Sequence, residues 1–161
     1  MEKWNMRANE VAYLLNPAFC GRIIYTVIQK YNETGNSFPF PLSYLVLPLI
    51  LHKSTRERID SRTQLLIWVQ RNPELLIDFS SHAKDLVMIT NEAMEYLLQS
   101  GLIILDSQAG LLVSPHVKKL SKTKHINSEI KQCIQKSEHI AKWFTESGTV
   151  ENIYVSLGVR P

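Results

Sequence analysis

Side chains that commonly carry out catalysis are scattered through this sequence. Five histidines are spread over 161 residues, and His82 lies three positions before Asp85 on one expected helix. That spacing would let a carboxylate orient an imidazole base, but any sequence of this length offers such pairs, and we interpret this one as a surface hydrogen bond. His116 and His125 have no third metal ligand near them, and no phosphate loop, HExxH or paired CxxC motif is present. The sequence therefore indicates no catalytic residues, no metal and no cofactor.

The clearest charged feature is the stretch 116–125, HVKKLSKTKH, which contains no acidic residue. Its four lysines are Lys118, Lys119, Lys122 and Lys124. A solvated linker is the simpler interpretation, because short lysine runs are common on protein surfaces. The alternative is sequence-independent contact with DNA phosphates, which would be sensitive to salt and would read no bases. Three arginines of the charged stretch 53–62 would join this contact if the fold brings them near: Arg56, Arg58 and Arg62.

Composition limits the class of protein. The net charge of +3 and the isoelectric point near 8.9 are mildly basic and do not by themselves indicate nucleic-acid binding. Cys20 and Cys133 both lie among apolar neighbours, so we expect buried free thiols in a reducing compartment. The first ten residues, MEKWNMRANE, lack the apolar core of a signal peptide. These features predict a cytoplasmic protein.

The segment 38–53, FPFPLSYLVLPLILHK, should lie at the centre of the fold. Between Leu42 and Leu51 only Ser43 interrupts the apolar residues, so no polar face exists for solvent. The run is too short for a transmembrane helix, which needs about 20 apolar residues. We expect a helix buried on nearly all sides, which Pro48 either kinks or divides in two.

A helix followed directly by a small hairpin is expected at 89–115. Thr90 can cap the helix, and Gly101 can end it in the left-handed conformation. The short apolar strands LIIL and LLV then flank the turn DSQAG. This order is typical of the second half of a winged helix, and helices between 62 and 88 would supply the first half.

The helix before the hairpin has the wrong charge for reading DNA. Its polar residues are Asn91, Glu92, Glu95, Gln99 and Ser100, with no lysine or arginine among them. Phosphate contacts supply much of the affinity of DNA-binding proteins, so two carboxylates oppose that use. We therefore expect this helix to contact protein.

The remaining elements are helical. Asn127 can cap a long helix that carries Trp143 and Phe144, which point in different directions, so at least one of them is expected to face a partner or a second element. A short helix ended by Gly158 follows. The sequence predicts a mainly α protein in a single compact domain, 1–161: a helical core at 10–88, a winged-helix-like unit at 89–115 and C-terminal helices at 127–158.

Several stretches in this order resemble the middle component of ABC three-component systems, which include the Lamassu class of bacterial anti-phage defence. They are NPAF, LSYLVLPLILHK, WVQRNPELL, EAMEYLLQSGLI and KWFTESGTVENIYVSLGVRP. The resemblance extends from about Asn9 to Pro161, and LVLPLILHK and the terminal LGVRP are its most specific parts.

The resemblance implies a non-enzymatic adaptor with no catalytic residues to carry over. Its partners would be an SMC- or Rad50-like ATPase and an effector such as a nuclease, which the adaptor helps to keep silent until foreign DNA is sensed. Contact with DNA would arise through the assembled complex. We expect the partner interface to include Glu92, Glu95, Trp143, Phe144 and Arg160.

Two other functions remain open on the sequence alone. The first is a free-standing winged-helix DNA-binding regulator, which the acidic helix before the hairpin disfavours. The second is an enzyme of unrecognised type, for which no acid, base and nucleophile stand out. An adaptor should be poorly soluble or weakly stable when isolated, because its interface leaves apolar surface exposed.

Overall fold

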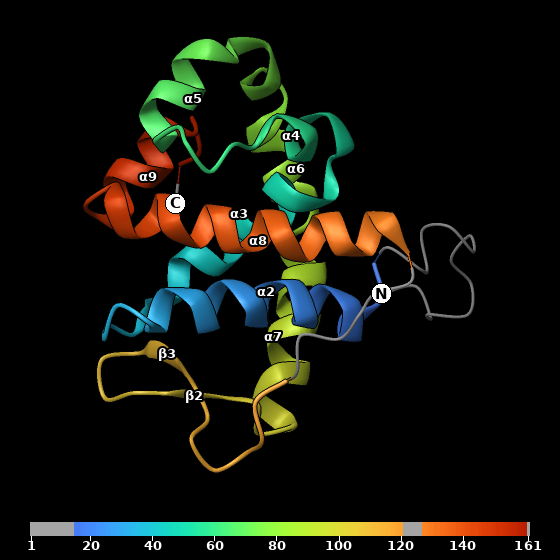
Figure 1. Cartoon of the computed structure of the whole chain (residues 1–161), viewed down its shortest axis with the longest axis vertical. Helices are drawn as coiled ribbons and strands as arrows, with labels where there is room; N and C mark the ends of the chain where they lie inside the picture. Colours follow the sequence, from blue (N-terminus) through green and yellow to red (C-terminus); the bar gives the residue numbers. More distant parts are fainter. Residues whose placement is uncertain (1–14, 121–126, 161) are drawn as a thin grey trace.

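The structure is a computed structural model that describes residues 15–120 and 127–160. It contains the following elements, in chain order: α2 (Pro17–Asn32), β1 (Phe38–Pro39), the 3-10 helix η2 (Phe40–Leu42), α3 (Ser43–Leu51), α4 (Lys53–Arg58), α5 (Leu65–Arg71), the 3-10 helix η3 (Pro73–Leu76), α6 (Phe79–Asp85), α7 (Val87–Gln99), β2 (Ile103–Leu105), β3 (Gly110–Val113), α8 (Ser128–Glu146) and α9 (Val150–Ser156). Figure 1 shows α2 and α8 crossing the middle of the molecule, with α4 and α5 at one end and the hairpin at the other. The prediction of a mainly α fold with a small hairpin is confirmed.

The apolar segment after residue 42 forms the centre, as its composition predicts. Seven residues of α3 are buried, and the helix packs against α2, α4, α6, α7 and α8. Pro48 lies inside α3 and does not end it. The helix stops at His52, whose extended backbone separates α3 from α4.

Side-chain caps begin both long helices, and the cap at Asn127 was predicted from the sequence. The amide N–H of Ala18 donates to Asn16 Oδ1 (2.8 Å) at the start of α2, and the Glu129 N–H donates to Asn127 Oδ1 (2.8 Å) at the start of α8. Each bond satisfies a backbone donor that a helix leaves free at its N-terminus. The apolar faces of these two helices meet, and the free thiols of Cys20 and Cys133 are both buried between them.

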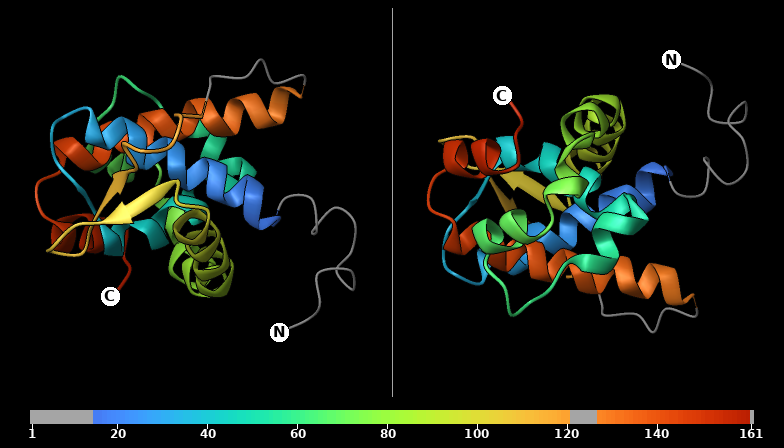
Figure 2. Two further views of the ribbon diagram at one scale, coloured as in Figure 1. Left: turned by 90° about the horizontal axis from the view of Figure 1, so that it is seen from below. Right: turned by 90° about the horizontal axis from the view of Figure 1, so that it is seen from above.

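The hairpin follows α7 directly, as expected (Figure 2). Gly101 ends α7 with a φ of 71° and two backbone bonds, from Gly101 N–H to the Leu98 carbonyl and from Leu102 N–H to the Leu97 carbonyl. These two bonds define a Schellman motif, which glycine adopts without strain. Strand β1 was not predicted from the sequence; it adds to β3 and gives the antiparallel sheet order β1-β3-β2.

Two local expectations differ from the structure. Helix α7 begins at Val87, so Thr90 is buried inside it and does not cap it. The helices between 62 and 88 do not complete the hairpin unit, because α2 and β1 pack against α7 and β3, whereas α5 lies at the opposite end (Figure 1).

Candidate functional site

The three most exposed large apolar side chains lie on α5, at the end of η3 and on α9. Leu66 is 58% exposed, Ile77 is 77% exposed and Val155 is 76% exposed. Helix α5 contacts both η3 and α9, and α5 and α9 lie next to one another in Figure 1. We call Leu66, Ile67, Ile77 and Val155 the α5–α9 surface. Exposed apolar side chains on elements that touch one another can mark contact with another protein.

The α5–α9 surface was not predicted, although the sequence contains a signal for it. Residues 65–69 are five consecutive apolar residues, LLIWV, on a helix of seven. A helix that packs by one face cannot bury five consecutive side chains, because successive residues point about 100° apart. Only Leu65 and Trp68 of α5 are buried, so Leu66 and Ile67 face outward.

A pocket of about 530 Å³ lies between α3, α6 and the C-terminal segment. Its apolar lining consists of Tyr44, Leu45, Ala83, Val87, Tyr154 and Val159. Gly158 shapes this wall: its φ is 69°, its N–H donates to the Val155 carbonyl, and the Val159 N–H donates to the Tyr154 carbonyl. This second Schellman motif turns the chain after α9, so that Val159 and the exposed Arg160 line the pocket.

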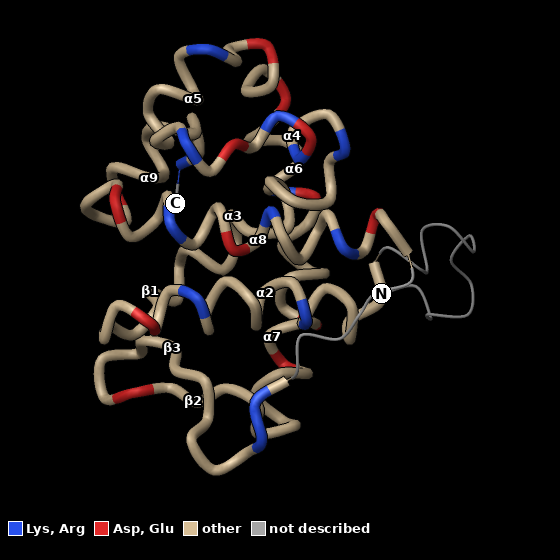
Figure 3. The backbone as a smooth tube through the Cα atoms, in the orientation of Figure 1, with Lys and Arg blue, Asp and Glu red and all other residues tan. Residues whose placement is uncertain are grey.

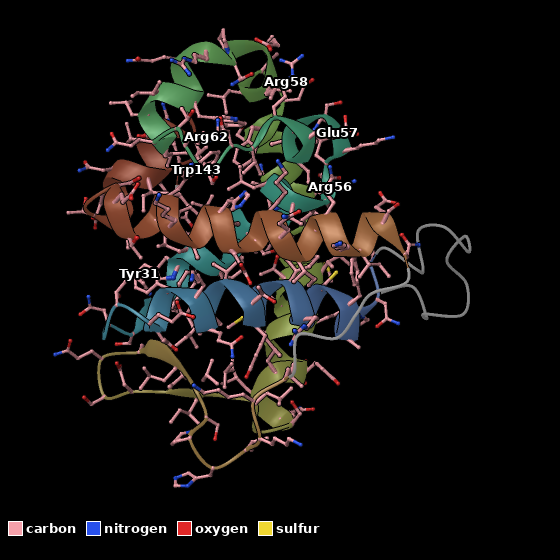
Figure 4. The ribbon with its side chains drawn as sticks, in the orientation of Figure 1. Tyr31, Arg56, Glu57, Arg58, Arg62 and Trp143 are labelled. Carbon is pink, nitrogen blue, oxygen red and sulfur yellow. The ribbon has the colours of Figure 1, made fainter. Side chains whose placement is uncertain are left out.

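Trp143 and Phe144 are buried against other elements of the chain, so the structure does not support placing them in the partner interface. Each is only 1% exposed. The indole N–H of Trp143 donates to the Thr63 carbonyl (2.6 Å), and the Trp143 ring lies 5.1 Å from the ring of Trp68 (Figure 4). Phe144 packs on the opposite side against Phe38. These two side chains of α8 are therefore covered within this chain, Trp143 by α5 and the turn before it, and Phe144 by the β1 region.

Arg56 was predicted to contact phosphate, and the structure corrects this prediction. Its side chain is 1% exposed. The guanidinium donates to the Ile50 carbonyl, Gln132 Oε1 and Glu129 Oε1, each at 2.9 Å. Arg56 therefore ties α4 to the end of α3 and to α8, and no donor is left facing solvent for a phosphate.

The chain matches the family described as ABC-three component (ABC-3C) system Middle Component 3 over residues 4–161. It belongs to this family. No curated protein and no solved structure matches the chain. The resemblance seen in the sequence is thereby confirmed, and the protein is an accessory component of a multi-component system.

The basic residues of this middle component do not form one patch. Arg58 pairs with Glu74, and Arg62 is exposed in the turn before α5. Lys118 and Lys119 are exposed in the segment after β3, at the hairpin end of the molecule, far from Arg58 and Arg62 (Figures 3 and 4). Lys122 and Lys124 lie outside the described residues. The predicted joint contact of the lysine run with the three arginines is therefore not assembled in the described parts of the chain.

The two carboxylates of helix α7 of the middle component differ in their exposure to solvent. Glu95 is exposed and accepts a hydrogen bond from Gln99 Nε2 (2.9 Å). Glu92 is half-buried, and its charge adds to the effect of burial in raising the pKa of the Cys20 thiol to about 12. Glu95 is thus available to a partner, whereas Glu92 faces α2.

The histidines form one pair and no metal site within the described residues. The rings of His52 and His82 lie 4.9 Å apart, and His52 Nδ1 lies 2.8 Å from the hydroxyl of Thr55. Burial, and then the charges of His82 and Arg56, lower the pKa of His52. Over 15–120 and 127–160, no group of three metal-ligating side chains occurs, and no helix has the length and apolar composition to cross a bilayer.

Proposed function

We propose that this middle component is a non-catalytic adaptor of an anti-phage defence complex of the Lamassu type, acting in the cytoplasm. It bridges an SMC- or Rad50-like ATPase to an effector such as a nuclease and helps to hold the effector inactive. The α5–α9 surface carries this proposal, because an adaptor needs exposed apolar anchors and this surface offers four. Family membership supports the accessory role.

Co-expression with the other two components of the system tests the role of the α5–α9 surface. The double variant Leu66→Ser/Ile77→Ser should no longer co-purify with at least one component, and the cells should lose phage resistance. The matched control is Ile104→Ser/Leu105→Ser, which changes two exposed apolar residues at the hairpin end. If both double variants co-purify with the other components as the wild type does, the proposal is contradicted.

We infer further that α2, β1, α3, α7, β2 and β3 form a winged-helix unit with α4–α6 inserted before α7. The support is the element order together with the sheet order β1-β3-β2, in which the strand after the first helix adds to the far strand of the hairpin. The outer surface of α7 presents Met88, Glu95 and Tyr96, and α7 has no lysine or arginine. Such a surface suits protein contact better than phosphate contact.

Contact with DNA, in this proposal, arises through the assembled complex and is not sequence-specific. Arg62 and the lysines of 116–125 contribute charge without reading bases. Replacing Lys118, Lys119, Lys122 and Lys124 by alanine should weaken DNA binding by the complex uniformly across sequences and flatten its dependence on salt. Tight, sequence-selective binding by the isolated chain would favour a DNA-binding regulator instead.

A further inference from the structure

We propose that the pocket between α3, α6 and the C-terminal segment binds an acidic segment of another component, which inserts an apolar side chain beside a carboxylate. This inference rests on the proposed adaptor function and names the chemistry of one partner. The pocket is separate from the four residues of the α5–α9 surface, none of which lines it.

The size and lining of the pocket fit an apolar side chain. A volume of about 530 Å³ lies within the range of about 300–1,000 Å³ typical of ligand sites. Leu45, Ala83 and Tyr154 provide a buried apolar floor, and the half-exposed Val87 and Val159 continue it outward. An apolar side chain placed here would be removed from water on several sides, which is the usual anchor of a peptide in a groove.

The charge of the pocket selects an acidic occupant. Lys84 of α6 and Arg160 of the C-terminal segment stand on different walls, and both are exposed. Neither takes part in any ion pair among the described residues, and no aspartate or glutamate is among the pocket's lining residues. Two unopposed cations beside an apolar floor complement a carboxylate next to an apolar residue. Nucleic acid would leave that apolar floor unused, so a protein segment fits better.

The walls of the pocket are held in place before any partner binds. The hydroxyl of Tyr154 donates to the Pro41 carbonyl (2.5 Å), and the hydroxyl of Tyr44 donates to Asn91 Oδ1 (2.7 Å). These bonds link α9 to η2, and α3 to α7. The Schellman motif at Gly158 fixes the direction of Val159 and Arg160. Preformed walls reduce the entropy lost on binding, so a short segment can bind usefully.

The test uses the complete complex, with the other two components as the probe. A photo-crosslinking p-benzoylphenylalanine replaces Ser80, which is exposed and lines the pocket, or Gln108, which is exposed in the hairpin turn as a control. We expect a crosslink from position 80 to a segment of another component that contains aspartate or glutamate next to an apolar residue. A crosslink from position 80 to a segment without acidic residues would overturn the inference, as would the absence of any crosslink.

Charge variants give a second measurement in the same complex. Lys84→Glu/Arg160→Glu should weaken the affinity for the crosslinked component on the order of tenfold, with a smaller effect at high salt. Lys84→Arg and the control Lys118→Glu/Lys119→Glu should leave this affinity unchanged. If the wild-type complex assembles and the pocket variants bind normally, the inference fails while the adaptor proposal stands. If the wild-type chain binds neither component, both fail.

Discussion

The indole rings of Trp68 and Trp143 meet inside the molecule with their centroids 5.1 Å apart and their planes inclined by 46°. Each indole N–H also donates to a backbone carbonyl, that of Arg58 for Trp68 and that of Thr63 for Trp143. The Arg58 carbonyl is at the end of α4 and the Thr63 carbonyl lies between α4 and α5, so the tryptophan pair attaches this connection and α5 to α8. It thereby supports the α5–α9 surface from beneath.

Replacing Trp143 should therefore destabilise the isolated protein. Trp143→Ala should lower the free energy of unfolding by about 3–5 kcal/mol through the cavity it creates, and Trp143→Phe by about 1–3 kcal/mol because the Thr63 carbonyl loses its donor. Urea unfolding followed by circular dichroism measures both. The control Tyr96→Phe changes an exposed aromatic residue and should have little effect. If Trp143→Ala is as stable as Tyr96→Phe, Trp143 does not support the core, and the prediction that it faces a partner is favoured.

Asn32 is expected to hold β3 where its short pairing with β1 ends. Its side-chain amide donates to the Leu111 carbonyl (3.2 Å) and the Asn36 carbonyl (3.0 Å), and its Oδ1 accepts from the Val113 N–H (3.0 Å). Asn32→Ala should cost about 1–3 kcal/mol, because buried backbone groups of β3 lose their partners. Asn32→Asp should also be destabilising, since a carboxylate cannot donate to the two carbonyls.

Hydrogen exchange gives a local measurement of this role. The amide of Val113 should exchange faster in Asn32→Ala than in the wild type, whereas the amides of α8 should not be preferentially affected. Asn36→Ala is the matched control, because it keeps the Asn36 carbonyl that accepts the bond. Unchanged protection of Val113 in Asn32→Ala would show that the sheet does not need this amide.

The His52–His82 pair predicts a loss of stability in mild acid. The pKa of His52 is lowered in the folded state, so the unfolded chain binds more protons as the pH falls below the usual value of about 6.5. The contribution of neutral His52 to the free energy of unfolding is therefore complete above about pH 6.5. It is lost as the pH falls toward the lowered pKa of folded His52.

Histidine NMR titration measures this effect directly. His82→Gln removes the second positive charge and should raise the pKa of His52, although burial, the larger cause, should keep it below its usual value. His116→Gln changes an exposed histidine after β3 and should leave the His52 titration unchanged. An identical His52 titration curve in His82→Gln would contradict the proposed coupling of the two rings.

The parts of the fold that the sequence predicted depend on local patterns. The buried α3, the cap at Asn127 and the hairpin after Gly101 each follow from residues close together in the chain. Strand β1 carries no such pattern, since it is only two residues beside prolines and exists because β3 pairs with it. The pocket was missed for a similar reason, because its walls come from residues 44–45, 80–87 and 154–160.

The sequence misplaced Arg56 because the partners that bury it are distant in the chain. A stretch as charged as 53–62 is usually solvated, and no residue near Arg56 indicates otherwise. Its two side-chain acceptors, Gln132 and Glu129, lie 76 and 73 positions away. Arg58, two positions later, does remain half-exposed with Glu74, so the same charged stretch contains one structural and one surface arginine.

This difference between the two arginines leads to a prediction with a built-in control. Arg56→Met should lower the free energy of unfolding by about 3 kcal/mol, because the Ile50 carbonyl loses its buried donor and α4 is no longer tied to α8. Arg58→Met, which removes a surface ion pair, should cost no more than about 1 kcal/mol. Urea unfolding compares the two. DNA affinity of the complex should be unchanged in Arg56→Met under conditions where the protein is folded, since the guanidinium is not accessible to phosphate. A stable Arg56→Met variant with weakened DNA binding would instead place this arginine at the DNA.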